Sequence, residues 1–153
     1  MLSIDCNFDL EVVTMANTFM DAYLRYMDSK GIKYRTLDDR CVRVAYNCEN
    51  IKTVAILVLF DKNGKNLVQF VCTEVANFKD NKYAAGLVLC NSLNAKYRWC
   101  KFYLDKDSDL LVEADALVEI NTVGSECAEM VSRMVDIIDG AYPDIMRANL
   151  NLN

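Results

Sequence analysis

The sequence lacks histidine altogether and contains only one proline and five glycines among 153 residues. Without histidine, a general acid or base at neutral pH would have to be a carboxylate, a lysine or a tyrosine with a shifted pKa. The scarcity of glycine and proline also leaves no segment with the composition of a linker. We therefore expect a single domain that spans residues 1–153.

Long apolar segments are missing as well. The longest uninterrupted apolar run, residues 54–60, has seven residues, whereas a membrane-spanning helix needs roughly 20. The first five residues, Met1 to Asp5, have neither the basic start nor the apolar stretch of a signal peptide. These features favour a cytoplasmic protein without a membrane partner.

Cysteine is frequent, but its spacing is not that of a metal site. The seven cysteines contain no Cys-x-x-Cys pair, and structural zinc sites need closely spaced ligands. An odd number of cysteines in a cytoplasmic chain also argues against a disulfide framework. We expect buried, inert thiols, no metal and no cofactor. The cysteines are Cys6, Cys41, Cys48, Cys72, Cys90, Cys100 and Cys127.

The chain is acidic, with a formal net charge of −5 and a pI near 4.7. An acidic surface repels phosphate groups and anionic lipids, so nucleic acid is not expected as a partner. The same charge keeps a protein soluble when it displays apolar surface.

Two spacings are reminiscent of catalytic or metal-binding chemistry, but their context favours a structural role. Cys127 and Arg133 have the Cys-x5-Arg spacing of phosphatases, yet the intervening residues read as helix and include Glu129, which would repel phosphate. Residues 105–109 read Asp-x-Asp-x-Asp but lack the glycine and glutamate of a calcium loop. With no glycine-rich phosphate loop either, we expect that the chain is not an enzyme.

Hydrophobic periodicity and turn signals predict an α+β fold with an antiparallel five-stranded sheet. The order is one helix, three strands, a second helix, two strands and a third helix. A short extra helical turn is expected after Gly140, beginning at Pro143. The predicted helices are 9–30, 80–95 and 123–139, and the predicted strands are 40–46, 52–60, 65–73, 98–104 and 109–116.

The dipeptide Asn63-Gly64 sets the expected register of the first hairpin. It favours a two-residue type I′ turn, which pairs Phe60 with Leu67. We expect the helices to cover the face of the strand that carries Ala55, Leu57 and Leu59. The opposite face would then bind a partner, unless the last helix or a dimer mate covers it. The expected partner-binding residues on this strand are Val54, Ile56, Val58 and Phe60.

The second hairpin is expected to place Leu104 opposite Leu110 and Lys101 opposite Glu113. Strand alternation then projects Trp99, Lys101 and Tyr103 from one face. Tryptophan and tyrosine are enriched at interfaces, so we interpret these three residues as part of the partner-binding surface or its rim. The alternative is that Trp99 packs beneath the last helix as core.

The helix at 80–95 is apolar on two sides, and such a helix is normally buried on both. One side carries Tyr83, Ala84, Leu87 and Cys90. The other carries a second strip, which we expect to form a homodimer interface because Gly86 allows close helix approach. The expected interface residues are Gly86, Leu89 and Leu93.

Residues 91–105, from Asn91 through Trp99 to Asp105, and residues 111–115 resemble the YbjN family, whose members are described as bacterial sensory transduction regulators. The resembling features are an asparagine-bearing helix end, an aromatic strand ending in Tyr-Leu-Asp and a Val-Glu-Ala strand. Cys100 departs from the pattern, which leads us to expect glycine or another small residue there. The resemblance implies a fold similar to type III secretion chaperones, often dimeric, that acts through protein contacts without catalysis.

These observations favour a non-enzymatic protein-binding domain, regulatory or chaperone-like, which acts on another protein or peptide through an apolar sheet face and forms a homodimer. The alternative is a sensory domain that binds a small molecule in an aromatic pocket. Trp99 and Tyr103 would be the walls of that pocket, with Lys101, Glu113 and Asn91 as its polar anchors.

Overall fold

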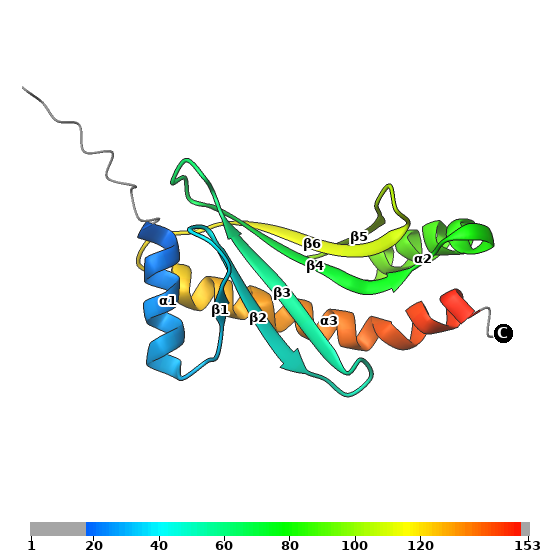
Figure 1. Cartoon of the computed structure of the whole chain (residues 1–153), viewed down its shortest axis with the longest axis horizontal. Helices are drawn as coiled ribbons and strands as arrows, with labels where there is room; N and C mark the ends of the chain where they lie inside the picture. The colour runs from blue at the N-terminus through cyan, green and yellow to red at the C-terminus, as the bar shows by residue number, and fades with distance from the viewer. Residues whose placement is uncertain (1–17, 151–153) are drawn as a thin grey trace, which may run out of the picture.

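The computed structural model describes residues 18–150 of the chain. Its element order confirms the predicted sequence of helices and strands, with one additional strand (Figure 1). The predicted start of the first helix, at Asp9, lies outside the described residues. The helices are α1 (Thr18–Lys30), α2 (Tyr83–Lys96) and α3 (Val123–Leu150), and a short 3-10 helix (Asp80–Lys82) precedes α2. The strands are β1 (Arg35–Thr36), β2 (Cys41–Asn47), β3 (Thr53–Phe60), β4 (Leu67–Asn77), β5 (Lys101–Leu104) and β6 (Asp109–Leu117).

The sheet has six strands in the order β1-β2-β3-β4-β6-β5, and every neighbouring pair is antiparallel. The predicted sheet had five strands, and β1 is the one that was missed. This strand has only two residues, Arg35 and Thr36, and both are exposed. Such a short, polar segment gives no alternation of apolar and polar residues from which a strand could be predicted.

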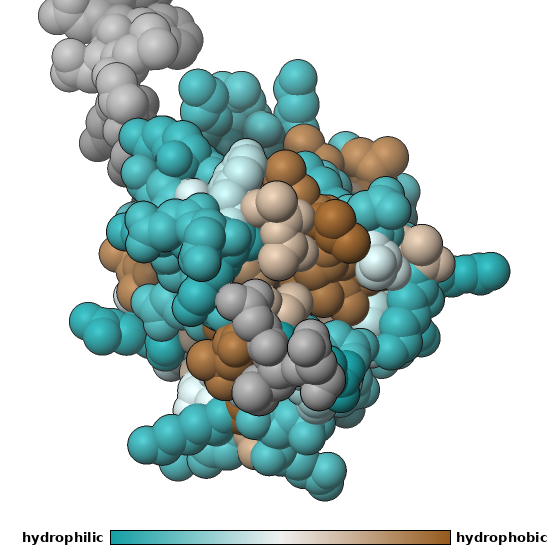
Figure 2. Space-filling view, turned by 90° about the vertical axis from the view of Figure 1, so that its right-hand side faces the viewer, coloured by the Kyte–Doolittle hydropathy of each residue, from teal (hydrophilic) through white to brown (hydrophobic). Residues whose placement is uncertain are grey.

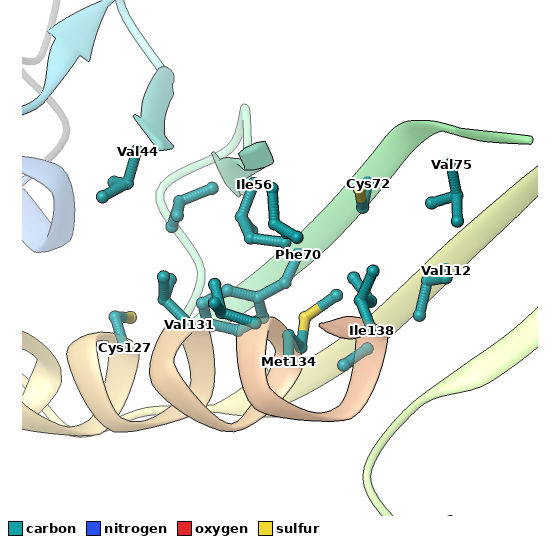
Figure 3. Close-up of a cluster of buried hydrophobic side chains, with 14 of the residues drawn as sticks. Val44, Ile56, Phe70, Cys72, Val75, Val112, Cys127, Val131, Met134 and Ile138 are labelled. Atoms are coloured by element: carbon teal, nitrogen blue, oxygen red, sulfur yellow. The ribbon is translucent and has the colours of Figure 1, made fainter. Parts of the chain in front are cut away.

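All three helices pack on the same face of the sheet, which we call the inner face. Helix α3 runs along the middle of this face, with α1 near one of its ends and α2 near the other (Figure 1). Figure 3 shows side chains of α3, among them Val131, Met134 and Ile138, pointing toward Ile56 and Phe70 of the sheet. The core is therefore a single layer of apolar side chains between the sheet and α3.

The register of the β3–β4 hairpin differs by one residue from the predicted one. Phe60 pairs with Val68 instead of Leu67, because the turn is longer than the two residues Asn63-Gly64. The carboxylate of Asp61 accepts the backbone N–H groups of Asn63 and Lys65, at 2.9 and 3.2 Å. These hydrogen bonds stabilise a wider turn, and a one-residue shift moves every side chain of a strand to the other face.

Helix α3 continues well past its predicted end at Asp139 and includes both Gly140 and Pro143. The apolar periodicity explains the continuation, because Ala141 and Ile145 are fully buried in line with the earlier core positions. Burial along one helical face stabilises the last turns enough to offset the cost of an internal proline. None of the helices within residues 18–150 is long and apolar enough to cross a bilayer.

Candidate protein-binding surface

The face of the sheet opposite the helices, which we call the outer face, is not covered by any described helix. Along β3, buried residues alternate with half-buried ones, as expected when only one face is covered. Its apolar residues centre on β3, and its charged residues lie on the strands toward the two edges. The outer-face residues include Arg35, Cys41, Arg43, Ala45, Asn47, Thr53, Ala55, Leu57, Leu59, Leu67, Gln69, Val71, Leu111, Glu113, Asp115, Leu117, Lys101 and Tyr103.

A hydrogen-bonded trio lies at the β5–β6 edge of the outer face. Lys101 pairs with Glu113 across the strands, as predicted, with 2.9 Å between Nζ and Oε2. The Tyr103 hydroxyl donates to Oε1 of the same carboxylate at 2.5 Å. This hydrogen bond, together with partial burial, raises the pKa of Tyr103 to about 12. Partial burial opposes ionisation of Glu113, but the hydrogen bonds from Tyr103 and Lys101 outweigh it and lower the pKa of Glu113.

The four β3 residues expected to bind a partner lie on the inner face, so their predicted orientation is wrong. Each is at most 1% exposed, and Tyr23 of α1 packs against Phe60 with 5.7 Å between the ring centroids. The shifted hairpin register is the cause. The residues concerned are Val54, Ile56, Val58 and Phe60. The alternate set Ala55, Leu57 and Leu59, expected to face the helices, is on the outer face instead.

Trp99 does not project from the same face as Lys101 and Tyr103. It lies before the start of β5 and has a positive φ of 76°, which takes the chain out of the strand alternation. The indole is 59% exposed, and its ring lies against Arg133 of α3, 5.4 Å from the guanidinium carbon to the ring centroid. Trp99 is therefore neither core nor part of the outer face.

The apolar strip expected to form a dimer interface faces the interior of its own chain. Gly86, Leu89 and Leu93 are buried, and a Cβ at Gly86 would lie 2.8 Å from the ring of Phe78. The small residue thus allows α2 to approach its own sheet layer. Cys90 of the other strip is buried as well, and the exposed large apolar residues of α2 are Tyr83, Leu87 and Val88, at 44%, 47% and 69% exposure.

Figure 2 shows hydrophobic residues gathered on the side of the molecule where α2 and the end of α3 lie, with hydrophilic residues around them. A shallow hollow of about 490 Å³ lies between the two helices there. The hollow is lined by Ala84, Ala85, Val88, Leu89, Ser92 and Ala148.

The cysteines are placed mainly in the core. Cys41, Cys72, Cys90 and Cys127 are buried, and the six cysteines among the described residues are free thiols. Burial raises the pKa of Cys72 to about 11 and that of Cys127 to about 12, so both remain protonated and unreactive at neutral pH. Within residues 18–150, no group of three or more acidic or cysteine side chains is positioned to hold a metal ion.

The sequence of residues 24–146 matches the YbjN family, described as "Putative bacterial sensory transduction regulator". The chain belongs to the YbjN family. Among the curated proteins, a sequence search found no match.

Solved structures share the fold. One is "Crystal structure of YbjN, a putative transcription regulator from E. coli", with 15% identity and a TM-score of 0.56 over 82% of this chain and 92% of that chain. A second is the ExoU–SpcU complex from the type III secretion system of Pseudomonas aeruginosa. Its sequence identity is 12% and its TM-score 0.54, over 82% of this chain and 95% of that chain. A third is the HopA1–SchA chaperone–effector complex, with 16% sequence identity and a TM-score of 0.55 over 86% of this chain and 98% of that chain.

Proposed function

We propose that the chain is a non-enzymatic protein-binding domain with a regulatory or chaperone-like role in the cytoplasm. The uncovered outer face carries this proposal, because the half-buried Leu57 and Leu59 lie on it, beside the buried Val71, and the other face of the sheet holds all the described helices. A partner segment lying there would remove apolar surface from water. The regulators of the YbjN family and the chaperone–effector complexes with the same fold support such a role.

Within this proposal, Lys101 and Tyr103 form one rim of the binding surface. Their hydrogen bonds to Glu113 hold both side chains in place, so little conformational entropy is lost when a partner packs against them. Trp99 with Arg133 forms a separate exposed contact on the helix side. Tryptophan and arginine are enriched among the residues that dominate binding energies.

The experiment that tests this role is capture of partners by tagged protein, repeated with Leu59→Asp, since Leu59 lies opposite the uncharged Cys41 and Gln69. A charge in the middle of the outer face is expected to lower capture of the specific partner at least tenfold, roughly the cost of leaving a charge unpaired in an interface. Ile120→Asp is the control, because it introduces the same charge at an exposed apolar residue that lies outside the sheet, in the loop before α3. Tyr103→Ala, at the rim, is expected to weaken the complex by about 1–3 kcal/mol. Equal capture by wild type and both Asp variants would refute the role of this face.

A homodimer is the second part of the proposal, with a second copy packed on the exposed side of α2. From Tyr83 to Ala95 this helix contains no charged residue, so two copies of a chain with net charge −5 can approach there without direct repulsion. Association would bury Leu87 and Val88, which are the exposed apolar residues at its centre.

Light scattering at micromolar concentration is expected to give twice the chain mass of 17.4 kDa. The variants Leu87→Asp and Val88→Asp should give monomers with unchanged circular dichroism. Leu117→Asp is the control, since Leu117 is 76% exposed but lies on β6, away from α2. A wild-type monomer at all concentrations tested would contradict this second part and leave the outer-face role intact.

The small-molecule alternative receives no support from a shared pocket. Trp99 contacts Arg133, whereas Tyr103 bonds to Glu113 on the outer face, so the two rings do not form the walls of one pocket. We expect thermal-shift measurements with small metabolites to show no stabilisation.

A further inference from the structure

Two arginines lie directly opposite each other at the β1–β2 edge of the outer face. The register pairs Arg35 of β1 with Arg43 of β2. Paired residues of an antiparallel ladder project from the same face, so the two arginine side chains leave the sheet side by side. Arg35 is exposed and Arg43 is half-buried.

Neither arginine side chain has an acidic partner among the described residues. The four ion pairs there join Lys96 and Arg147 with Asp144, Lys101 with Glu113, and Arg133 with Glu129. Like charges directly opposite each other destabilise a sheet. The chain has 22 acidic residues against 17 basic ones, yet none of the acidic residues within 18–150 forms an ion pair with either arginine.

The arginine pair is continuous with the apolar middle of the outer face. Along one row of the sheet, Arg43 lies opposite Leu57 and Leu57 lies opposite Val71. The row continues to Glu113 and Lys101, whose charges compensate each other. The uncompensated charge of this row is therefore positive and lies at one end, beside the apolar residues.

We propose that the outer face binds a partner segment in which acidic side chains accompany apolar ones. The apolar side chains pack on the half-buried Leu57 and Leu59, and a carboxylate lies between Arg35 and Arg43. Arginine suits this role because its planar guanidinium donates two parallel hydrogen bonds to one carboxylate. The inference rests on the proposed function of the outer face and adds the chemistry of the segment it recognises.

The test uses three synthetic peptides with the same alternating Leu and Val residues and with Glu, Gln or Lys at the positions between them. Binding to the full chain is measured by fluorescence anisotropy at low and high salt. We expect the Glu peptide to bind roughly tenfold more tightly than the Gln peptide, the Lys peptide to bind most weakly, and the Glu preference to shrink at high salt.

The double variant Arg35→Gln/Arg43→Gln is expected to bind the Glu and Gln peptides equally. Arg25→Gln/Lys106→Gln is the matched control, because it removes the same charge from exposed positions on α1 and in the β5–β6 turn. The single variant Arg35→Glu gives a further readout. It places a carboxylate opposite Arg43, so the melting temperature should rise while Glu-peptide binding is lost. If Arg35 instead had only a structural role, the substitution would lower the melting temperature.

The outcomes separate this inference from the proposed function. If Leu59→Asp abolishes binding but the arginine variants match their control, the outer face binds partners without the acidic preference. Equal or tighter binding of the Lys peptide also overturns the acidic preference. If none of the peptides binds and Leu59→Asp leaves partner capture unchanged, both proposals fail.

Discussion

Asn50 donates its side-chain amide to the backbone carbonyl of Asp139, at 3.1 Å. That carbonyl lies four residues before Pro143, which has no N–H to complete the helical hydrogen bond. The loop between β2 and β3 supplies the missing donor. The Asp139 carboxylate in turn accepts the backbone N–H groups of Glu49, Asn50 and Ile51. The loop and the proline-containing turn of α3 therefore stabilise each other.

Replacing Asp139 with Asn should lower the denaturation midpoint at neutral pH. The backbone N–H of Ile51, with those of Asn50 and Glu49, holds the pKa of the Asp139 carboxyl below its ordinary value. A lowered folded-state pKa means that the ionised group stabilises the fold above the unfolded pKa of about 3.9. This contribution is lost as the pH falls through the folded pKa.

The difference between wild type and Asp139→Asn should accordingly narrow below about pH 4. Urea denaturation at pH 7 and pH 3 measures it. Asp136→Asn is the control, one turn earlier on α3, because its carboxylate accepts none of the loop hydrogen bonds. If the stability difference between wild type and Asp139→Asn were the same at both pH values, the β2–β3 loop would not depend on the negative charge of Asp139.

The two glycines inside α3 should respond in opposite directions to alanine. A Cβ at Gly124 would overlap the Cβ of Tyr26, so Gly124→Ala forces α1 and α3 apart and should cost about 1–3 kcal/mol. A Cβ at Gly140 would lie 3.5 Å from the Tyr97 hydroxyl, which is an ordinary contact distance. Gly140→Ala should therefore stabilise the helix by up to about 1 kcal/mol. Denaturation curves of both variants measure these changes in the free energy of unfolding. Similar changes for the two variants would contradict the close approach of α1 and α3 at Gly124.

Asn94 pairs with the free edge of the sheet as a further strand would. Its amide donates to the carbonyl of Phe102 at 3.0 Å and accepts the N–H of Phe102 at 2.7 Å. Asn94→Ala leaves both backbone groups unpaired and should cost about 1–3 kcal/mol. It should also increase aggregation on heating, because an unpaired edge invites strand pairing.

Asn91→Ala is the matched control for this prediction, since Asn91 is exposed and lies one turn earlier on α2. Its effect on stability should stay within about 0.5 kcal/mol. Light scattering on heating and denaturant titration compare the two variants. Equal stability would mean that Asn94 does not protect the edge.

Trp99 should show the fluorescence of an exposed indole. Because 59% of the residue is accessible, its emission should be red-shifted and quenched by acrylamide. Arg133→Ala should alter the emission and cost no more than about 1 kcal/mol, the usual size of an exposed cation–π contact. As Trp99 is the sole tryptophan of the chain, the signal is unambiguous, and a blue, protected emission would place it in an interface or the core.

The local parts of the fold could be predicted because short-range patterns specify them. The β5–β6 hairpin has its expected register, with Lys101 opposite Glu113 and Leu104 opposite Leu110. Apolar residues alternate cleanly there, so only one register buries them all. Gly31 ends α1 with a φ of 65°, as expected for a helix-terminating glycine.

The β3–β4 hairpin could not be predicted in the same way, because β3 is apolar on both faces. Its sequence offers two equivalent registers, and Asn63-Gly64 favoured the wrong one. The hydrogen bonds from Asn63 and Lys65 to Asp61 select the other. Helix α2 posed the same problem, since two apolar sides left open which one faces the core.

The sequence alone determined the class of the fold, the order of its elements, the family and the lack of a histidine-based site, since these depend on composition and local periodicity. The tertiary structure decided which residues are exposed. Packing against Phe78 fixed the inward side of α2, and a one-residue shift fixed the outer face of β3. The Arg35–Arg43 pair could also be found only in the tertiary structure, because β1 is too short to be predicted from the sequence. Which of two apolar faces is covered depends on long-range contacts, and no local pattern encodes them.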